Sequence, residues 1–193
     1  MKRRDAIKQT ALIMGYAVSA SAISGVLAGC QATGGMDWTP VYLSKDQGTL
    51  LAEIAEIIIP ASDTPGAKDV FVHEFIDTMI GKYLKAEEGE TLKAGLAQVD
   101  ADAQAAHGKK FMSCTPEQQT ALLVKMADDT QAAMEADPSL RKNKPFFVLM
   151  KELTMLGYFT SEVVGKEIFS FDPVPGEYGD CIPVEEVKNS WTI

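Results

Sequence analysis

Apolar residues recur at helical spacing in five stretches of the chain, which predicts five amphipathic helices. The first helix opens at Ser44, where a serine followed three residues later by Gln47 forms a capping-box pattern, and it ends at Pro60. A second helix is predicted over residues 69–84. A third carries a stripe of small apolar side chains, which suits close helix packing, and ends near His107.

Two further helices are predicted in the second half of the chain. The fourth begins with Thr115 as a cap and a proline at the first helical position, and its periodicity turns Leu123 and Ala133 inward. The fifth begins near Pro145 and is apolar on nearly every side, so we expect it to be the central helix. Residues 157–162 either continue this helix or break it.

These patterns predict an all-α fold, a compact helical bundle of about five helices, because no stretch shows sustained period-two alternation. An extended Pro/Gly-rich C-terminal arm is predicted over residues 171–193, since its prolines and glycines prevent a helix. We divide the chain into a leader (1–29), a tether (30–43) and a single helical domain (44–193) that includes the arm.

The leader has the pattern of an export signal. Arg3 and Arg4, with Lys8 four residues on, form a basic start, and a weakly apolar stretch then ends in Leu-Ala-Gly before Cys30. The paired arginines indicate the twin-arginine (Tat) route, and the ending is typical of a lipobox, in which the cysteine is acylated. A membrane-spanning anchor is the alternative, but the glycines and serines of this stretch leave too little apolar content for a helix that crosses the bilayer. We expect Tat export and a lipid anchor at Cys30 on the periplasmic side of a bacterial membrane.

The charge of the exported part narrows the class of partner. Residues 1–29 hold four of the 18 basic residues and one of the 27 acidic ones, so the remainder has a formal charge of −12. Nucleic acids and anionic lipid surfaces both require clustered lysine and arginine, so neither is an expected electrostatic partner. The acyl chains on Cys30 would then provide the membrane attachment.

Cysteines and histidines give no cofactor site. With Cys30 assigned to the lipid, Cys114 and Cys181 remain as an even pair in an oxidising compartment, where a disulfide is plausible. Two unpaired thiols or a bridge to another chain are the alternatives. The only histidines, His73 and His107, are isolated, and no Cys-x-x-Cys motif is present, so we expect no metal or haem. His73 lies just off the apolar stripe of its helix and is interpreted as a boundary residue.

The sequence contains no recognisable catalytic arrangement. Its glycines are scattered and form no fingerprint for FAD, NAD or a nucleotide, and its polar pairs fit helix caps or solvated faces. We therefore expect a chain with no catalytic, cofactor-binding or metal residues. Aromatic residues crowd the final quarter, which fits either a core with a self-packed tail or an interface with a large partner.

Three blocks of sequence carry a family resemblance. They are the helix end that leads into Asp63-Thr64-Pro65-Gly66-Ala67, the block Gly157-Tyr158-Phe159-Thr160-Ser161-Glu162, and the arm block Pro173-Val174-Pro175-Gly176-Glu177-Tyr178. In this order they resemble the gluconate 2-dehydrogenase subunit 3 family. One departure is that two residues, Val163 and Val164, precede Gly165, where many relatives have one.

The resemblance implies the small, non-catalytic subunit of a membrane-associated dehydrogenase. In that family a large flavoprotein of the glucose-methanol-choline type holds FAD and oxidises the sugar or polyol, and a multihaem cytochrome c often takes the electrons. The small subunit carries the export signal for both chains. By this resemblance the candidates for partner contact are Asp63, Thr64, Pro65, Gly66, Gly157, Tyr158, Phe159, Thr160, Ser161, Glu162, Pro175, Gly176 and Tyr178. The alternative from the residues alone is a free-standing envelope lipoprotein that binds a ligand or scaffolds a complex.

Overall fold

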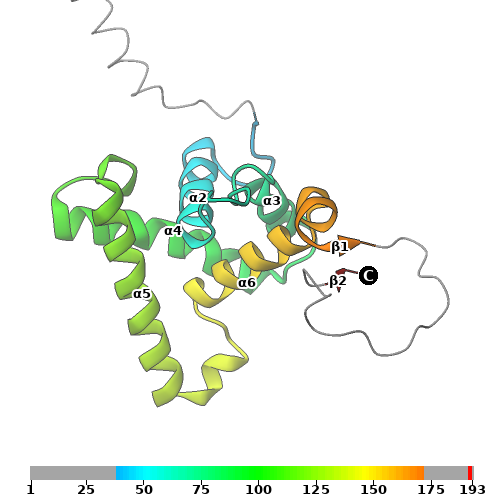
Figure 1. Cartoon of the computed structure of the whole chain (residues 1–193). Helices are drawn as coiled ribbons and strands as arrows, with labels where there is room; N and C mark the ends of the chain where they lie inside the picture. Colours follow the sequence, from blue (N-terminus) through cyan, green and yellow to red (C-terminus); the bar gives the residue numbers. More distant parts are fainter. Residues whose placement is uncertain (1–37, 172–190, 193) are drawn as a thin grey trace, which may run out of the picture. The chain divides into compact units, whose positions relative to one another are not determined.

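A computed structural model describes residues 38–171 and 191–192, which belong to one compact unit. Five α-helices form this unit (Figure 1), and the predicted all-α bundle is confirmed. The helices are α2 (Lys45–Ile58), α3 (Val72–Lys82), α4 (Ala86–His107), α5 (Pro116–Ala136) and α6 (Phe146–Phe159), with 3₁₀ turns η1 (Phe111–Ser113) and η2 (Pro138–Arg141) at either end of α5.

Helix α6 is the centre of the bundle, as its apolar sequence predicts. It packs against α2, α3, α4 and α5, and it lies across the bundle in Figure 1. Leu149, Met150 and Leu153 are buried along it and join the same core as Leu51 and Ile76 of α2 and α3. The burial of these side chains is the main force that holds the helices together.

Local signals in the sequence set the helix ends. The Ser44 hydroxyl accepts a hydrogen bond from the Gln47 N–H, and the Gln47 amide oxygen accepts one from the Ser44 N–H. Thr115 caps α5 by the same reciprocal arrangement. Helix α4 is capped by Gly108, whose φ of 68° lies in the left-handed region that favours glycine.

Helix α3 begins three residues later than the periodicity predicts. Residues 67–71 form a turn in which the Val72 N–H donates to the Ala67 carbonyl, so the helix cannot extend back through them. The last turn residue, Phe71, has φ 57° and ψ 33°, a left-handed conformation that breaks a right-handed helix. The predicted boundary position of His73 is also wrong, because its side chain is buried at 5% exposure beneath Trp38.

The second half of α5 does not pack as predicted. Only Gln119 and Leu123 are buried in α5, and Ala133, which the periodicity turns inward, is exposed. The helix extends past the other helices toward η2 in Figure 1, so its inward stripe has no neighbour to cover it there.

Helix α6 continues to Phe159, and the following turn at Thr160 and Ser161 separates it from the π-helix η3 (Val164–Ile168). The Phe169 N–H donates to the Val164 carbonyl five residues back. Strand β1 (Ser170–Phe171) then pairs in parallel with β2 (Trp191–Thr192), so the predicted arm is held at both ends.

Residues 38–43 are bound to the bundle, although they fall within the predicted tether. The buried carboxylate of Asp77 accepts hydrogen bonds from the backbone N–H groups of Val41, Tyr42 and Leu43 at 2.8 to 3.3 Å. We call residues 38–43 the clamped segment. Arg3, Arg4, Lys8 and Cys30 lie outside the described residues, as do Pro175, Gly176, Tyr178 and Cys181, so the predictions about them remain predictions.

Candidate partner-binding site

The loop between α2 and α3 is fixed by one carboxylate. Glu56, near the end of α2, accepts the Ala61 N–H at 3.1 Å with Oε1 and the Lys68 N–H at 2.9 Å with Oε2. The Ser62 N–H donates to the Thr64 carbonyl at 2.9 Å inside the loop. Because hydrogen bonds to a charged acceptor are stronger than neutral ones, Glu56 holds both ends of the loop in a defined conformation.

Gly66 permits this arrangement. It is buried, and its N–H donates to Asp69 Oδ2 at 2.8 Å. A Cβ at this position would lie 2.7 Å from the Ala61 nitrogen and would overlap the Glu56 carboxylate. Any side chain here would therefore displace the group that holds the loop.

Tyr158 joins this loop to α6. Its hydroxyl donates to the Pro65 carbonyl at 2.8 Å, across 93 residues of sequence, and the side chain is only 5% exposed. The neighbouring Gly157 lies against the Phe75 ring of α3, because a Cβ there would come within 2.7 Å of that ring. Two of the blocks that carry the family resemblance are thus brought together in space.

Both elements of the junction carry exposed residues. Asp63 and Thr64 are exposed on the loop, and Met155, Leu156 and Phe159 are 42% to 47% exposed on α6. We call these five residues the partner platform. The Phe159 ring packs edge-on against the Tyr158 ring, with ring centres 5.4 Å apart, and stacks on the Phe169 ring, with ring centres 5.8 Å apart. These two rings hold Phe159 in place while it remains partly exposed.

The other predicted contact residues divide by burial. Gly66, Gly157 and Tyr158 lie inside and shape the junction, while Thr160 and Glu162 are exposed. The remaining two described candidates, Pro65 and Ser161, are partly buried. A hydrogen bond from Lys166, together with its charge, holds the pKa of the Glu162 carboxyl below its usual value, so this exposed group is anionic.

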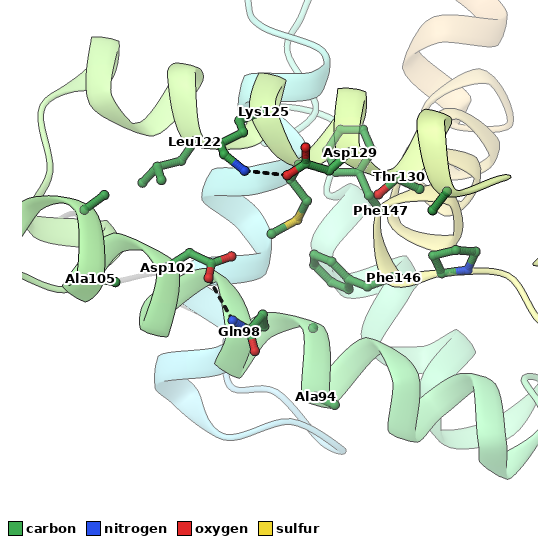
Figure 2. A pocket seen from close by; sticks show the side chains of 15 residues that line it. Ala94, Gln98, Asp102, Ala105, Leu122, Lys125, Asp129, Thr130, Phe146 and Phe147 are labelled. Carbon is green, nitrogen blue, oxygen red and sulfur yellow. Dashed lines mark hydrogen bonds and ion pairs between the residues drawn. The ribbon is translucent and has the colours of Figure 1, made fainter. Parts of the chain in front are cut away.

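A separate groove lies between α4, α5 and the start of α6 (Figure 2). Its volume is about 850 Å³, and its lining is mainly apolar, with Ala94, Ala105 and Leu122 on the helices and Phe146 and Phe147 at one end. Figure 2 shows two polar pairs at its rim, Gln98 with Asp102 and Lys125 with Asp129. Asp129 at the rim is therefore paired with Lys125, and Asp102 accepts a hydrogen bond from the neutral Gln98 amide.

The comparison with protein families identifies the group. The family model named gluconate 2-dehydrogenase subunit 3 matches residues 45–176, which is more than half of the chain. The chain belongs to the gluconate 2-dehydrogenase subunit 3 family. No curated protein and no solved structure matches it.

The match to gluconate 2-dehydrogenase subunit 3 covers every helix of the bundle and both blocks that meet at the junction. The clamped segment lies before the matched range. The junction is therefore part of the family fold.

Sequence reasoning missed the two carboxylates that hold the structure of this family member. Glu56 binds backbone N–H groups of the loop that follows its own helix, and Asp77 binds those of a segment 34 to 36 residues earlier in the chain. A signal was present for Asp77, because it lies on the apolar side of α3, four residues after His73 and next to Ile76. A buried carboxylate requires hydrogen-bond donors, so an acidic residue in such a stripe indicates a clamp.

The described residues offer little for catalysis. Across residues 38–171 and 191–192, no three His, Cys, Asp or Glu side chains gather as they would around a metal ion. Cys114 is buried, its Sγ lies 3.5 Å from the Lys110 carbonyl, and it has no disulfide partner within these residues. No helix in the described part of the chain is long and apolar enough to cross a membrane.

Proposed function

We propose that this chain is the non-catalytic small subunit of a periplasmic, FAD-dependent sugar or alcohol dehydrogenase of the glucose-methanol-choline type. The catalytic subunit is a separate large flavoprotein that holds FAD and the substrate pocket. A cytochrome c with haem then accepts the electrons. Family membership supports the role as a dehydrogenase subunit, and the flavoprotein and cytochrome are our inference from that membership.

The observation that carries the proposal is the junction of the loop and α6. Glu56 and Tyr158 fix the loop against the central helix, so the partner platform is held in place before any partner binds. A preformed surface loses little conformational freedom on binding. Its exposed phenylalanine and methionine are residue types enriched in the cores of protein interfaces.

The leader supplies the second half of the proposed role. Arg3, Arg4 and Lys8 would direct a folded complex to the Tat route, and acylated Cys30 would anchor it at the membrane. The small subunit would thereby export, anchor and stabilise the catalytic chain. Replacing Arg3 and Arg4 by lysine should retain this chain and the dehydrogenase activity in the cytoplasm, and normal export of both would contradict this part.

Co-purification tests the partner assignment. A tagged full chain, extracted from its own membranes in mild detergent, should bring down a large protein with flavin absorbance. The double variant Leu156→Ser, Phe159→Ser should weaken this association about tenfold or more, because buried aromatic anchors dominate interface energies. Val124→Ser is the matched control, since Val124 is 54% exposed on α5, outside the partner platform.

Two results would contradict the proposal. One is a purified chain that carries no flavoprotein. The other is a double variant that still folds and binds the flavoprotein as tightly as the Val124→Ser control, which would exclude the platform as the contact surface.

A second candidate function rests on the groove between α4 and α5. Its volume of about 850 Å³ falls in the range of small-molecule sites, roughly 300–1,000 Å³, and its apolar lining suits an apolar ligand. A free-standing lipoprotein would use such a groove to carry a ligand. Native mass spectrometry of the tagged chain would reveal a bound small molecule, and Ala105→Trp should expel it by filling the groove.

A further inference from the structure

Phe71 combines two unfavourable features. Its backbone has φ 57°, a left-handed conformation that crowds the Cβ of a bulky residue, and it is the only non-glycine residue with positive φ in the described part of the chain. Its side chain is 61% exposed, so core packing does not account for its presence. An exposed aromatic ring held on strained backbone is a candidate for a functional contact.

Three apolar side chains of the clamped segment also lie on α3: Trp38, which is half-buried, and Val41 and Tyr42, which are exposed. The Trp38 and Phe71 rings both meet the buried His73 ring, with ring centres 5.1 Å and 6.3 Å away. Val41 is 75% exposed, and Tyr42, whose ring lies on Gly81, is 37% exposed. We call Trp38, Val41, Tyr42 and Phe71 the aromatic face.

The aromatic face is rigid and carries no charge of its own. Asp77 binds three consecutive backbone N–H groups of the clamped segment, and Pro40 packs on Gly48 of α2. The clamped segment has no ionisable group except the Tyr42 phenol, in a chain of net charge −9. Burial, and secondarily the charge of Lys68, lower the pKa of His73 beneath the face.

Helix α3 lies between the clamped segment and α6. His73, Asp77 and Gly81 recur every four residues on one side of α3 and contact the clamped segment. Phe75, which supports Gly157 of α6, lies two positions from Asp77 and therefore about 200° around the helix. The clamped segment and Gly157 of α6 thus contact opposite sides of α3, so the platform and the face can bind different partners.

We propose that the aromatic face seats in the interfacial layer of the bilayer to which Cys30 is anchored. This rests on the proposed lipid anchor. Only eight residue steps separate Cys30 from Trp38, which limits the distance between them to roughly 29 Å, so the face cannot move far from the lipid surface. Tryptophan and tyrosine favour this layer because their rings are apolar and their N–H or O–H groups remain hydrated. An uncharged lipid interface also suits an acidic chain better than anionic headgroups do.

Fluorescence of Trp38 tests the contact. The lipidated full chain, carrying Trp191→Phe so that Trp38 is the only tryptophan, is reconstituted in phosphatidylcholine vesicles with or without bromine on the acyl chains. Bromine should quench Trp38, and added salt should leave the quenching unchanged. The double variant Val41→Ser, Phe71→Asn should shift the docking equilibrium by at least about tenfold toward the undocked state, because it removes most of the exposed apolar area.

The variants separate the possible outcomes. Asparagine tolerates left-handed backbone, so Phe71→Asn should keep or raise the melting temperature, and Val124→Ser should leave quenching unchanged. Chain present in the vesicles with unquenched Trp38 overturns the docking alone. Chain absent from the vesicles overturns the anchor and the docking together. Shielding of Trp38 from an aqueous quencher only when the flavoprotein is bound also overturns the docking, because it would assign the face to a protein partner.

Discussion

Glu56→Gln tests whether one carboxylate holds the loop of the partner platform. The carboxylate presents two acceptor oxygens to the Ala61 and Lys68 N–H groups, and an amide presents only one. The variant therefore loses one hydrogen bond and turns an NH₂ donor toward an N–H donor. The side chain keeps its size, so packing is unchanged.

The expected cost follows from the geometry. A hydrogen bond to a charged group contributes roughly 1.5–3 kcal/mol, and the Ala61 bond is at the exposed end of the loop, so we expect a loss of about 1–2 kcal/mol in the free energy of unfolding. For a domain of this size each 1 kcal/mol lowers the melting temperature by about 2–4 °C, which predicts a drop of about 2–8 °C. Circular dichroism during thermal and guanidinium unfolding measures both values.

Two comparison variants sharpen this experiment. Glu135→Gln is the matched control, because Glu135 lies on the exposed side of α5 and bonds only to Gln131 one turn away. It should change stability by less than about 0.5 kcal/mol. Gly66→Ala disturbs the same carboxylate as Glu56→Gln, so the two effects should not add in the double variant. A Glu56→Gln protein as stable as the Glu135→Gln protein, or strict additivity with Gly66→Ala, would refute the bridging role.

Three further substitutions test other contacts. Tyr158→Phe should lower the free energy of unfolding by about 1 kcal/mol, because the part-buried Pro65 carbonyl loses its hydrogen-bond donor. Flavoprotein binding should weaken as well, and a variant with unchanged unfolding and binding would contradict the proposed role of the junction. Asp77→Asn should release the clamped segment, seen as a red shift of Trp38 emission, whereas an unshifted spectrum would count against the clamp. The pKa of His73 is lowered in the folded state, so the unfolded chain binds the proton more readily. The contribution of His73 to the free energy of unfolding is therefore complete above about pH 6.5 and is lost as the pH falls below that value. Replacing His73 by phenylalanine should flatten the fall in guanidinium stability between about pH 7 and pH 5, and an unaltered slope would show that other groups cause it.

The contacts that the sequence predicts well are local. Ser44 with Gln47, and Thr115 with the glutamine three residues on, satisfy each other's backbone donors within one turn, so their pattern alone determines where α2 and α5 begin. The blocks that carry the family resemblance can likewise be recognised as short stretches of sequence. The contact between Tyr158 and Pro65 cannot be predicted from the sequence, because 93 residues separate them and only the packing of α6 on α3 brings them together.

Periodicity fails where a helix has no neighbour. The apolar spacing of α5 includes Ala133, yet burial depends on what lies opposite, and the described helices leave that part of α5 uncovered. The predicted start of α3 is too early for a different reason, which concerns Phe71. Nothing in its residue type signals left-handed backbone, since phenylalanine avoids that region, so the late start of α3 is set by the loop bonds around it.

Helix α3 connects the two proposed contacts through its period. Residues 73, 77 and 81 bind the clamped segment on one side, while Phe75 supports Gly157 under the partner platform on the other. A helix of 11 residues packed on α2, α4 and α6 moves as a rigid body, so a face seated on lipid would fix the direction in which the platform points. An anchor at Cys30 alone would tether the flavoprotein without orienting it. The clamp at Asp77 is the feature that would convert a tether into a fixed orientation, which is why the release of Trp38 in Asp77→Asn bears on both proposals.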